Sequence, residues 1–235
     1  MAQTGFFHHI GTFLLFVSTI LLIIVCISAP VVHDIAILKV ELGNRPTSQH
    51  ATVTFGTFGW CINNVDGDTC SSSHVGYSPA DVINSQDNTQ FSDYARDTTR
   101  ALTKAMVLHP IACGVSFIAF LLALGAGVLG SFLASVVAFL AFLLTAIITI
   151  IDFVAFAVVR NNINDNGTGA AAYFSTAIWC LLAAAILLLL ATIIVFLTCC
   201  SGRRHRRTAA TTKTEYISPP RTQPVYGRRR WWSRR

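Results

Sequence analysis

The longest apolar run in the chain, Ala105–Val159, sets the strongest limit on its fold. Over 55 residues its only acidic or basic side chains are His109 and Asp152. A single helix of this length, at about 1.5 Å per residue, would be far longer than a bilayer is thick. Three glycines gather near the middle of the run, in the segment 125–131. The run is therefore predicted to form a helical hairpin that crosses a membrane twice.

Two more apolar runs are long enough to cross a membrane: Ile10–Ala29, and a stretch from about Ala171 to Cys200. The composition agrees, because 53% of the residues are hydrophobic and only 12% are charged, well below the charged fraction of a soluble protein. The first run could instead be a signal peptide that is cleaved. No Lys or Arg precedes it and Pro30 follows it, which favours a helix that is retained. Four membrane-spanning helices are expected.

The distribution of basic residues predicts how these helices are oriented. Of the 17 Lys and Arg residues, 11 lie in Ser201–Arg235, directly after the fourth run. Because basic segments next to a span stay in the cytoplasm, both termini are expected there. The predicted order is a cytoplasmic N-terminus (1–9), a first span (10–30), an extracellular loop domain (31–104), a second span (105–126), a short cytoplasmic turn (127–130), a third span (131–159), an extracellular loop (160–170), a fourth span (171–200) and a basic, disordered cytoplasmic tail (201–235).

The first extracellular loop is predicted to fold into strands followed by helix. Ile35–Leu42 and Thr52–Trp60 alternate in the manner of half-buried strands, and the second pattern slips by one residue across Gly56, as at a β-bulge. Ser78 followed by Pro79 is typical of a helix start. A later set of residues recurs at a spacing of three or four and predicts a helix continuous with the second span: Phe91, Tyr94, Thr98 and Leu102.

The positions of the cysteines and of one sequon suggest covalent modifications. Cys61 and Cys70 lie outside the predicted helices, on the side expected to be oxidising, so a disulfide that closes a turn between two strands is favoured over two free thiols. Cys199 and Cys200 end the fourth run beside basic residues, where S-palmitoylation and simple packing are both open. Asn166 begins the single N-glycosylation sequon and falls in the second extracellular loop, although the match can also arise by chance.

Polar residues inside the apolar run have two interpretations. Asp152 is the single acid there, and such a residue marks either a functional site or a carboxylate satisfied by a neighbour near the interface, which is the favoured interpretation. His109 next to Pro110 is expected to serve packing or hydrogen bonding rather than to bind a ligand. Small residues at every fourth position, including Ala119 with Ala123 and Ala134 with Ala138, predict closely packed helices.

The end of the chain is predicted to contact lipid. Basic residues follow the fourth run, and a Trp pair lies among arginines at the terminus, where indole rings favour the headgroup region. The candidates are Arg203, Arg204, Arg206, Arg207, Trp231 and Trp232. Alternatively, the first cluster only sets orientation and the second is a solvated end. A nucleic-acid partner is not expected for so short a segment tethered to a membrane.

Several short motifs resemble the fungal PalI-type family of four-span membrane proteins. They are Phe55-Gly56-Thr57-Phe58-Gly59-Trp60-Cys61, Cys70, Val75-Gly76-Tyr77, Leu102-Thr103-Lys104, and Val107-Leu108-His109-Pro110. The resemblance covers about Phe6–Cys200, and it assigns the motif residues Gly56, Gly59, Trp60, Gly76, Tyr77, His109 and Pro110. The family is related to the eisosome-associated tetraspans and is similar in layout to claudins. The fold that this implies is an all-α membrane four-helix bundle with a small, disulfide-bearing extracellular domain of sheet and helix.

The resemblance implies a regulator rather than an enzyme. PalI-type proteins resemble assistants of an ambient-pH sensing complex in the plasma membrane, so the expected partners are membrane lipid and a multispanning sensor. The chain contains none of the common hydrolase, zinc-protease or phosphate-loop motifs, and no cofactor or metal is expected. The alternative is a claudin-like or eisosome-type organiser of membrane domains or wall contact that associates with itself. A transport pore is less favoured, because no span carries a polar stripe.

Overall fold

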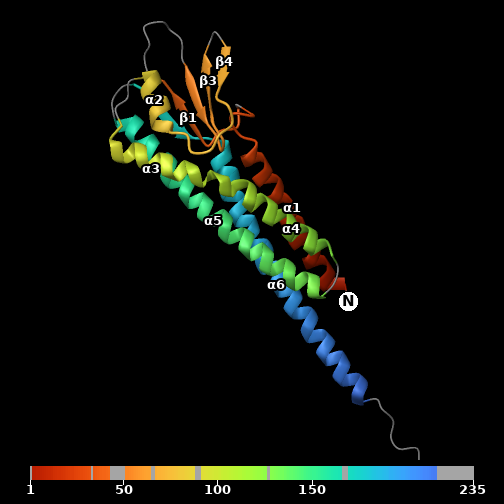
Figure 1. Ribbon diagram of the computed structural model, residues 1–235. Helices are drawn as coiled ribbons and strands as arrows, with labels where there is room; N and C mark the ends of the chain where they lie inside the picture. Colours follow the sequence, from red (N-terminus) through yellow and green to blue (C-terminus); the bar gives the residue numbers. More distant parts are fainter. Residues whose placement is uncertain are drawn as a thin grey trace, which may run out of the picture.

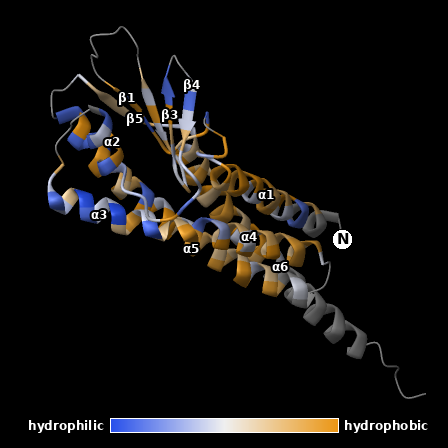
Figure 2. Cartoon of the chain, turned by 45° about the horizontal axis from the view of Figure 1, so that its top comes forward, coloured by the Kyte–Doolittle hydropathy of each residue, from blue (hydrophilic) through white to orange (hydrophobic). Residues whose placement is uncertain are grey.

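The structure is a computed structural model that describes residues 2–32, 34–42, 51–64, 67–87, 91–125, 128–165 and 169–215 (Figure 1). Within them, four helices are long and apolar enough to cross a membrane, as predicted. These spans are His8–Cys26, Asp93–Leu124, Phe132–Asp165 and Thr176–Thr198. Among the residues coloured in Figure 2, apolar ones dominate these helices, whereas polar ones gather at the end of the bundle where the strands lie.

Four helices form the bundle: α1 (Ala2–Cys26), α4 (Leu108–Leu124), α5 (Val128–Asp165) and α6 (Thr176–Glu215). Helix α1 packs against α4 and α6, and α5 packs against the same two helices. The small residues at every fourth position lie in these contacts, since Ala119, Ala123, Ala134 and Ala138 are all buried. Their short side chains let the helix backbones approach one another closely, which drives helix association in lipid.

A five-stranded antiparallel sheet lies at one end of the bundle. Its strands are β1 (Leu38–Glu41), β2 (Thr52–Phe55), β3 (Trp60–Asn64), β4 (Gly67–Cys70) and β5 (Ala171–Phe174), in the order β4-β3-β2-β1-β5. Leu38 pairs with Phe55 on one side and with Phe174 on the other. The sheet therefore joins the first loop to a segment more than 100 residues later.

Helices α2 (Pro79–Asp87) and α3 (Asp93–Lys104) complete what we call the sheet domain, which consists of β1–β5, α2 and α3. Ser78 caps α2 as predicted, because its Oγ accepts from the Asp81 N–H at 3.2 Å. A single 3₁₀ turn, η1 (Ala105–Val107), joins α3 to α4. Phe55 and Ile83 share one apolar core with Phe156 of α5, so the sheet domain is packed onto the bundle.

Three details differ from the sequence prediction. Gly56 is not at a bulge: its N–H donates to the Gly59 carbonyl at 2.9 Å, which closes a turn between β2 and β3. The segment 171–174, predicted to begin the fourth span, is strand β5, because the edge of β1 offers it backbone partners. The segment 201–215, predicted to be disordered, continues α6 as helix to Glu215.

Helix α3 buries a face that is lined mainly by threonines. The helix forms where the three-and-four spacing predicted it, but Tyr94, which contributed to that pattern, is 81% exposed. Ala95, Thr99 and Thr103 are buried instead. Threonines can line this face because their hydroxyls donate to carbonyls: Thr99 donates to Ala95 at 2.9 Å and Thr103 to Tyr77 at 2.6 Å.

Candidate functional site

The glycine-rich turn between β2 and β3 lies directly against the chain that leaves α1. A Cβ atom added at Gly56 would lie 2.3 Å from the carbonyl oxygen of Ala29, and one at Gly59 would lie 3.1 Å from Cδ of Pro30. Backbone atoms of Ala29 cannot move aside as a flexible side chain would. Gly56 is therefore required by close approach, and the turn fixes the sheet domain to the end of α1.

Buried hydroxyls strengthen this contact. Thr57 is fully buried, and its hydroxyl donates to the Val25 carbonyl in the last turn of α1 at 2.8 Å. Its backbone N–H donates to Ser28 Oγ at 3.0 Å. Because the Thr57 proton is already engaged, the Ser28 hydroxyl donates to Thr57 Oγ1 across their 3.1 Å separation. The Val25 carbonyl at the end of α1 therefore accepts two hydrogen bonds, one from the Thr57 hydroxyl and one from the Ser28 N–H at 3.2 Å.

Tyr77 connects the same turn to α3. Its ring stacks on Phe55, and its hydroxyl donates to the Gly56 carbonyl at 2.6 Å. Gly76, just before it, has φ +77°, a conformation that glycine adopts without the strain of a Cβ. Burial raises the pKa of Tyr77 well above 10, and the nearby charge of Asp152 raises it further. Tyr77 is therefore a neutral hydrogen-bond donor that lies close to the polar pair described next.

His109 of α4 and Asp152 of α5 form a buried pair beneath the sheet domain. Nε2 of His109 lies 3.0 Å from Oδ2 of Asp152, and the two side chains are 0% and 1% exposed. The Nδ1–H of His109 donates to the Met106 carbonyl at 3.0 Å, because a carbonyl can only accept. Asp152 is thus satisfied by a neighbour, as favoured from the sequence, although Oδ1 has no hydrogen-bond partner in the described structure.

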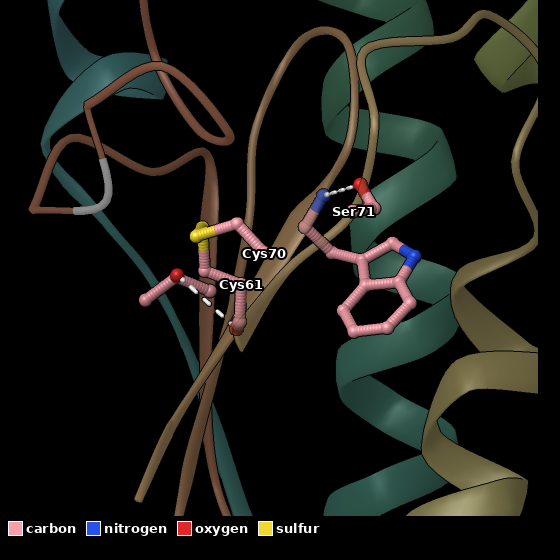
Figure 3. Close-up of a disulfide and its surroundings, with 5 residues drawn as sticks. Cys61, Cys70 and Ser71 are labelled. Atoms are coloured by element: carbon pink, nitrogen blue, oxygen red, sulfur yellow. Dashed lines mark hydrogen bonds between the residues drawn. A yellow bond between two sulfur atoms is a disulfide. The ribbon is translucent and has the colours of Figure 1, made fainter. Parts of the chain in front are cut away.

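The Cys61–Cys70 disulfide links β3 to β4, as predicted (Figure 3). The two cysteines are directly paired across the strands. Next to the bridge, the Trp60 N–H donates to Ser71 Oγ at 3.1 Å. The disulfide therefore holds the outer hairpin of the sheet beside the glycine turn.

We define the junction as the contact of Gly56–Gly59 and Tyr77 with the end of α1 and with the His109–Asp152 pair, and four of the seven motif residues lie in it: Gly56, Gly59, Tyr77 and His109. Trp60 instead donates its N–H to Ser71, and Gly76 lies against Lys104 of α3. Pro110 is exposed in the first turn of α4, where a missing N–H costs nothing. Cys199, Cys200 and the arginines at 203, 204, 206 and 207 lie in α6, toward its other end. Asn166, Trp231 and Trp232 lie outside the described residues.

Three hydroxyl residues that contribute to the junction were given no role from the sequence: Ser28, and Thr57 and Thr103, which belong to the motifs that resemble the family. Single hydroxyls next to helix ends carry no distinctive pattern. His109 and Asp152 were also treated separately, although they are the only basic and acidic residues of the long apolar run. Within the described residues, no three His, Cys, Asp or Glu side chains gather in a way that would hold a metal ion.

Comparison with known protein families identifies the family to which the chain is similar. The SUR7/PalI family matches residues 7–191, which is most of the chain and includes the junction. The chain belongs to the SUR7/PalI family. With four apolar helices and relatives in membranes, this SUR7/PalI protein is a multi-pass membrane protein. Its membership confirms the resemblance read from the sequence motifs.

Three relatives share about a third of their aligned residues with this SUR7/PalI protein. The "pH-response regulator protein palI/RIM9" of Emericella nidulans is 29% identical over 115 residues, which are 49% of this chain and 18% of that protein. The protein of the same name from Pyricularia oryzae is 30% identical over 106 residues, 45% of this chain and 13% of that protein. The "Uncharacterized membrane protein TOS7" of Saccharomyces cerevisiae is 31% identical over 106 residues, 45% of this chain and 16% of that protein. The matched part spans less than a fifth of each relative.

Proposed function

We propose that this protein is a non-catalytic accessory or scaffold protein of the plasma membrane that assists a multispanning partner in an ambient-pH sensing complex. Family membership supports a role in pH response, since two relatives are named pH-response regulators. The observation that carries the proposal is the junction. Its glycines and hydroxyls hold the sheet domain at a fixed position on the end of α1, and the buried pair joins α4 to α5 beneath it. A rigidly mounted domain is suited to presenting a binding surface.

Co-purification tests the partnership. The tagged full chain, extracted in mild detergent, is expected to retain a multispanning membrane protein that mass spectrometry identifies. The Gly56→Ala variant should retain less of it, because the sheet domain is displaced, whereas Gly114→Ala, at a position with open space around it, should retain the same amount. Recovery of the chain with copies of itself and no other membrane protein would contradict the accessory role.

We also propose that both termini are cytoplasmic and that the sheet domain is extracellular. The basic residues after the fourth span support this orientation. Protease added to intact cells should spare a C-terminal tag and should cleave it after permeabilisation. Removal of the tag from intact cells would reverse the orientation.

The alternative is a claudin-like or eisosome-type organiser of membrane domains. One observation favours it: β4 is an edge strand whose four residues are all exposed, so it offers a surface for lateral contact between copies. Cross-linking in native membranes distinguishes the two functions. Chain-to-chain products through β4 would support the organiser, and products with a different multispanning protein would support the accessory role.

A further inference from the structure

A groove runs between α5 and α6 in the half of the bundle away from the sheet domain. It has a volume of about 410 Å³. Its lining residues from α5 are Phe132, Ser135, Val136 and Phe139, and those from α6 are Leu189, Thr192, Ile193, Phe196 and Leu197. Counted at about 1.5 Å per residue, the lining spans about 10–12 Å along the helices.

The polar side chains that line the groove are already hydrogen-bonded, so they do not oppose the binding of an apolar ligand. Its two polar side chains use their protons within their own helices: Ser135 donates to the Phe132 carbonyl at 2.8 Å, and Thr192 donates to the Leu188 carbonyl at 2.7 Å. Both are buried, at 3% and 9% exposure, and form the floor. The hollow exists because these short side chains lie between larger ones.

The rim of the groove favours a thin occupant over another helix. Phe139, Phe196 and Leu197 are each about half exposed and project from the bundle surface. Helices that pair in lipid bring small residues together so that their backbones can approach. Large aromatic and aliphatic side chains along both rims would hold a second backbone away, whereas a hydrocarbon chain can lie between them.

The charge beyond the groove indicates the ligand's headgroup. Helix α6 continues past Leu197, and arginines occupy positions 203, 204, 206 and 207. At about 1.5 Å per residue these positions begin about 9 Å beyond Leu197, just outside the apolar part of the helix. Basic clusters at this level attract anionic lipid headgroups. We propose that the α5/α6 groove binds one acyl chain of an anionic phospholipid whose phosphate group lies at the arginine cluster.

Photolabelling tests this site in the full chain reconstituted into nanodiscs. Phosphatidylserine with a photoreactive group in its acyl chain should label peptides containing 132–139 and 189–197 at least fivefold more than phosphatidylcholine carrying the same group. Val136→Trp should reduce the labelling to the phosphatidylcholine level, because it fills the groove from an exposed rim position. Ile118→Trp, at an equally exposed position on α4 that does not line the groove, should leave the labelling unchanged.

A second variant tests the proposed contact between the lipid headgroup and the arginines. Replacing the four arginines by Gln should abolish the preference for phosphatidylserine, and this variant keeps the test decisive if Val136→Trp does not fold. Equal labelling by the two lipids in the wild-type chain would overturn the proposal, since the groove would then hold only bulk lipid. The proposal would also be overturned if the groove peptides were not photolabelled and two chains were cross-linked to each other, because the occupant would then be a second copy of the chain.

Discussion

Replacement of His109 or Asp152 should reveal how strongly the buried pair couples α4 to α5. Nδ1 of His109 already donates to Met106, so a single proton is shared between Nε2 and Oδ2 of Asp152. His109→Leu removes the only hydrogen-bond partner of Asp152 in the described structure and leaves a carboxylate in a site that is 1% exposed. Breaking a buried pair in this way costs about 3–5 kcal/mol.

Substitutions of Asp152 should cost less stability than His109→Leu, and they should differ from one another in a defined order. Asp152→Leu leaves a neutral imidazole nitrogen without a partner, which costs about 1–3 kcal/mol. Asp152→Asn keeps the hydrogen bond, because the new amide N–H can donate to Nε2 while Nδ1 still donates to Met106, so its cost should stay near 1 kcal/mol, the net value of one hydrogen bond. The double variant His109→Leu, Asp152→Leu should be more stable than His109→Leu alone, because no buried polar group is left unpaired.

Reversible unfolding in mixed micelles, monitored by circular dichroism, measures these differences. The expected order of stability is wild type, Asp152→Asn, Asp152→Leu, then His109→Leu, with the double variant above the last. A His109→Leu variant as stable as Asp152→Asn would refute the reasoning. So would a double variant whose loss equals the sum of the two single losses, since independent sites add.

Three further outcomes are expected. Gly56→Ala should destabilise the protein by about 1–3 kcal/mol, because the new Cβ meets the backbone of Ala29, while Gly114→Ala should not; thermal unfolding of both variants checks this. Reduction of the disulfide should cost about 2–3 kcal/mol for so short a ring, which non-reducing peptide mapping and unfolding with and without reductant would reveal. Glu41→Gln should lower the pKa of Tyr173 from about 12 toward 10, because the phenol loses its carboxylate acceptor, as measured by ultraviolet difference titration. The raised pKa means that this hydrogen bond stabilises the fold below about pH 10 and that its contribution disappears as the pH rises to about 12; an unchanged titration in the variant would contradict the assignment.

The membrane bundle and the disulfide could be predicted because each follows from a local rule. An apolar run of 55 residues has to fold back, and a cysteine pair in an oxidising loop has few alternatives. The motif glycines were recognisable as special positions. Their purpose was not, because the contact of Gly56 with Ala29 joins segments that only the folded chain brings together.

Features that depend on pairing between distant segments could not be predicted from the sequence. The segment 171–174 is apolar enough to pass for the start of a span, and only the free edge of β1 makes it a strand. The buried face of α3 could not be predicted, because Thr99 and Thr103 are polar and fit a core only once their hydroxyls donate to carbonyls. Spacing predicts a helix well, but hydrogen bonding decides which side of it is buried.

The pairing of β1 with β5 has a consequence for biosynthesis. Glu41 pairs with Ala171, so 130 residues separate partners in adjacent strands. At about 5–20 residues per second, a ribosome needs roughly 7 to 26 s to supply β5 after β1 has been made. During that interval α4 and α5 must enter the membrane while β1 waits with one edge unpaired, a state prone to association with other strands. A nascent chain arrested before residue 171 would therefore carry a sheet in which one edge of β1 has no partner strand.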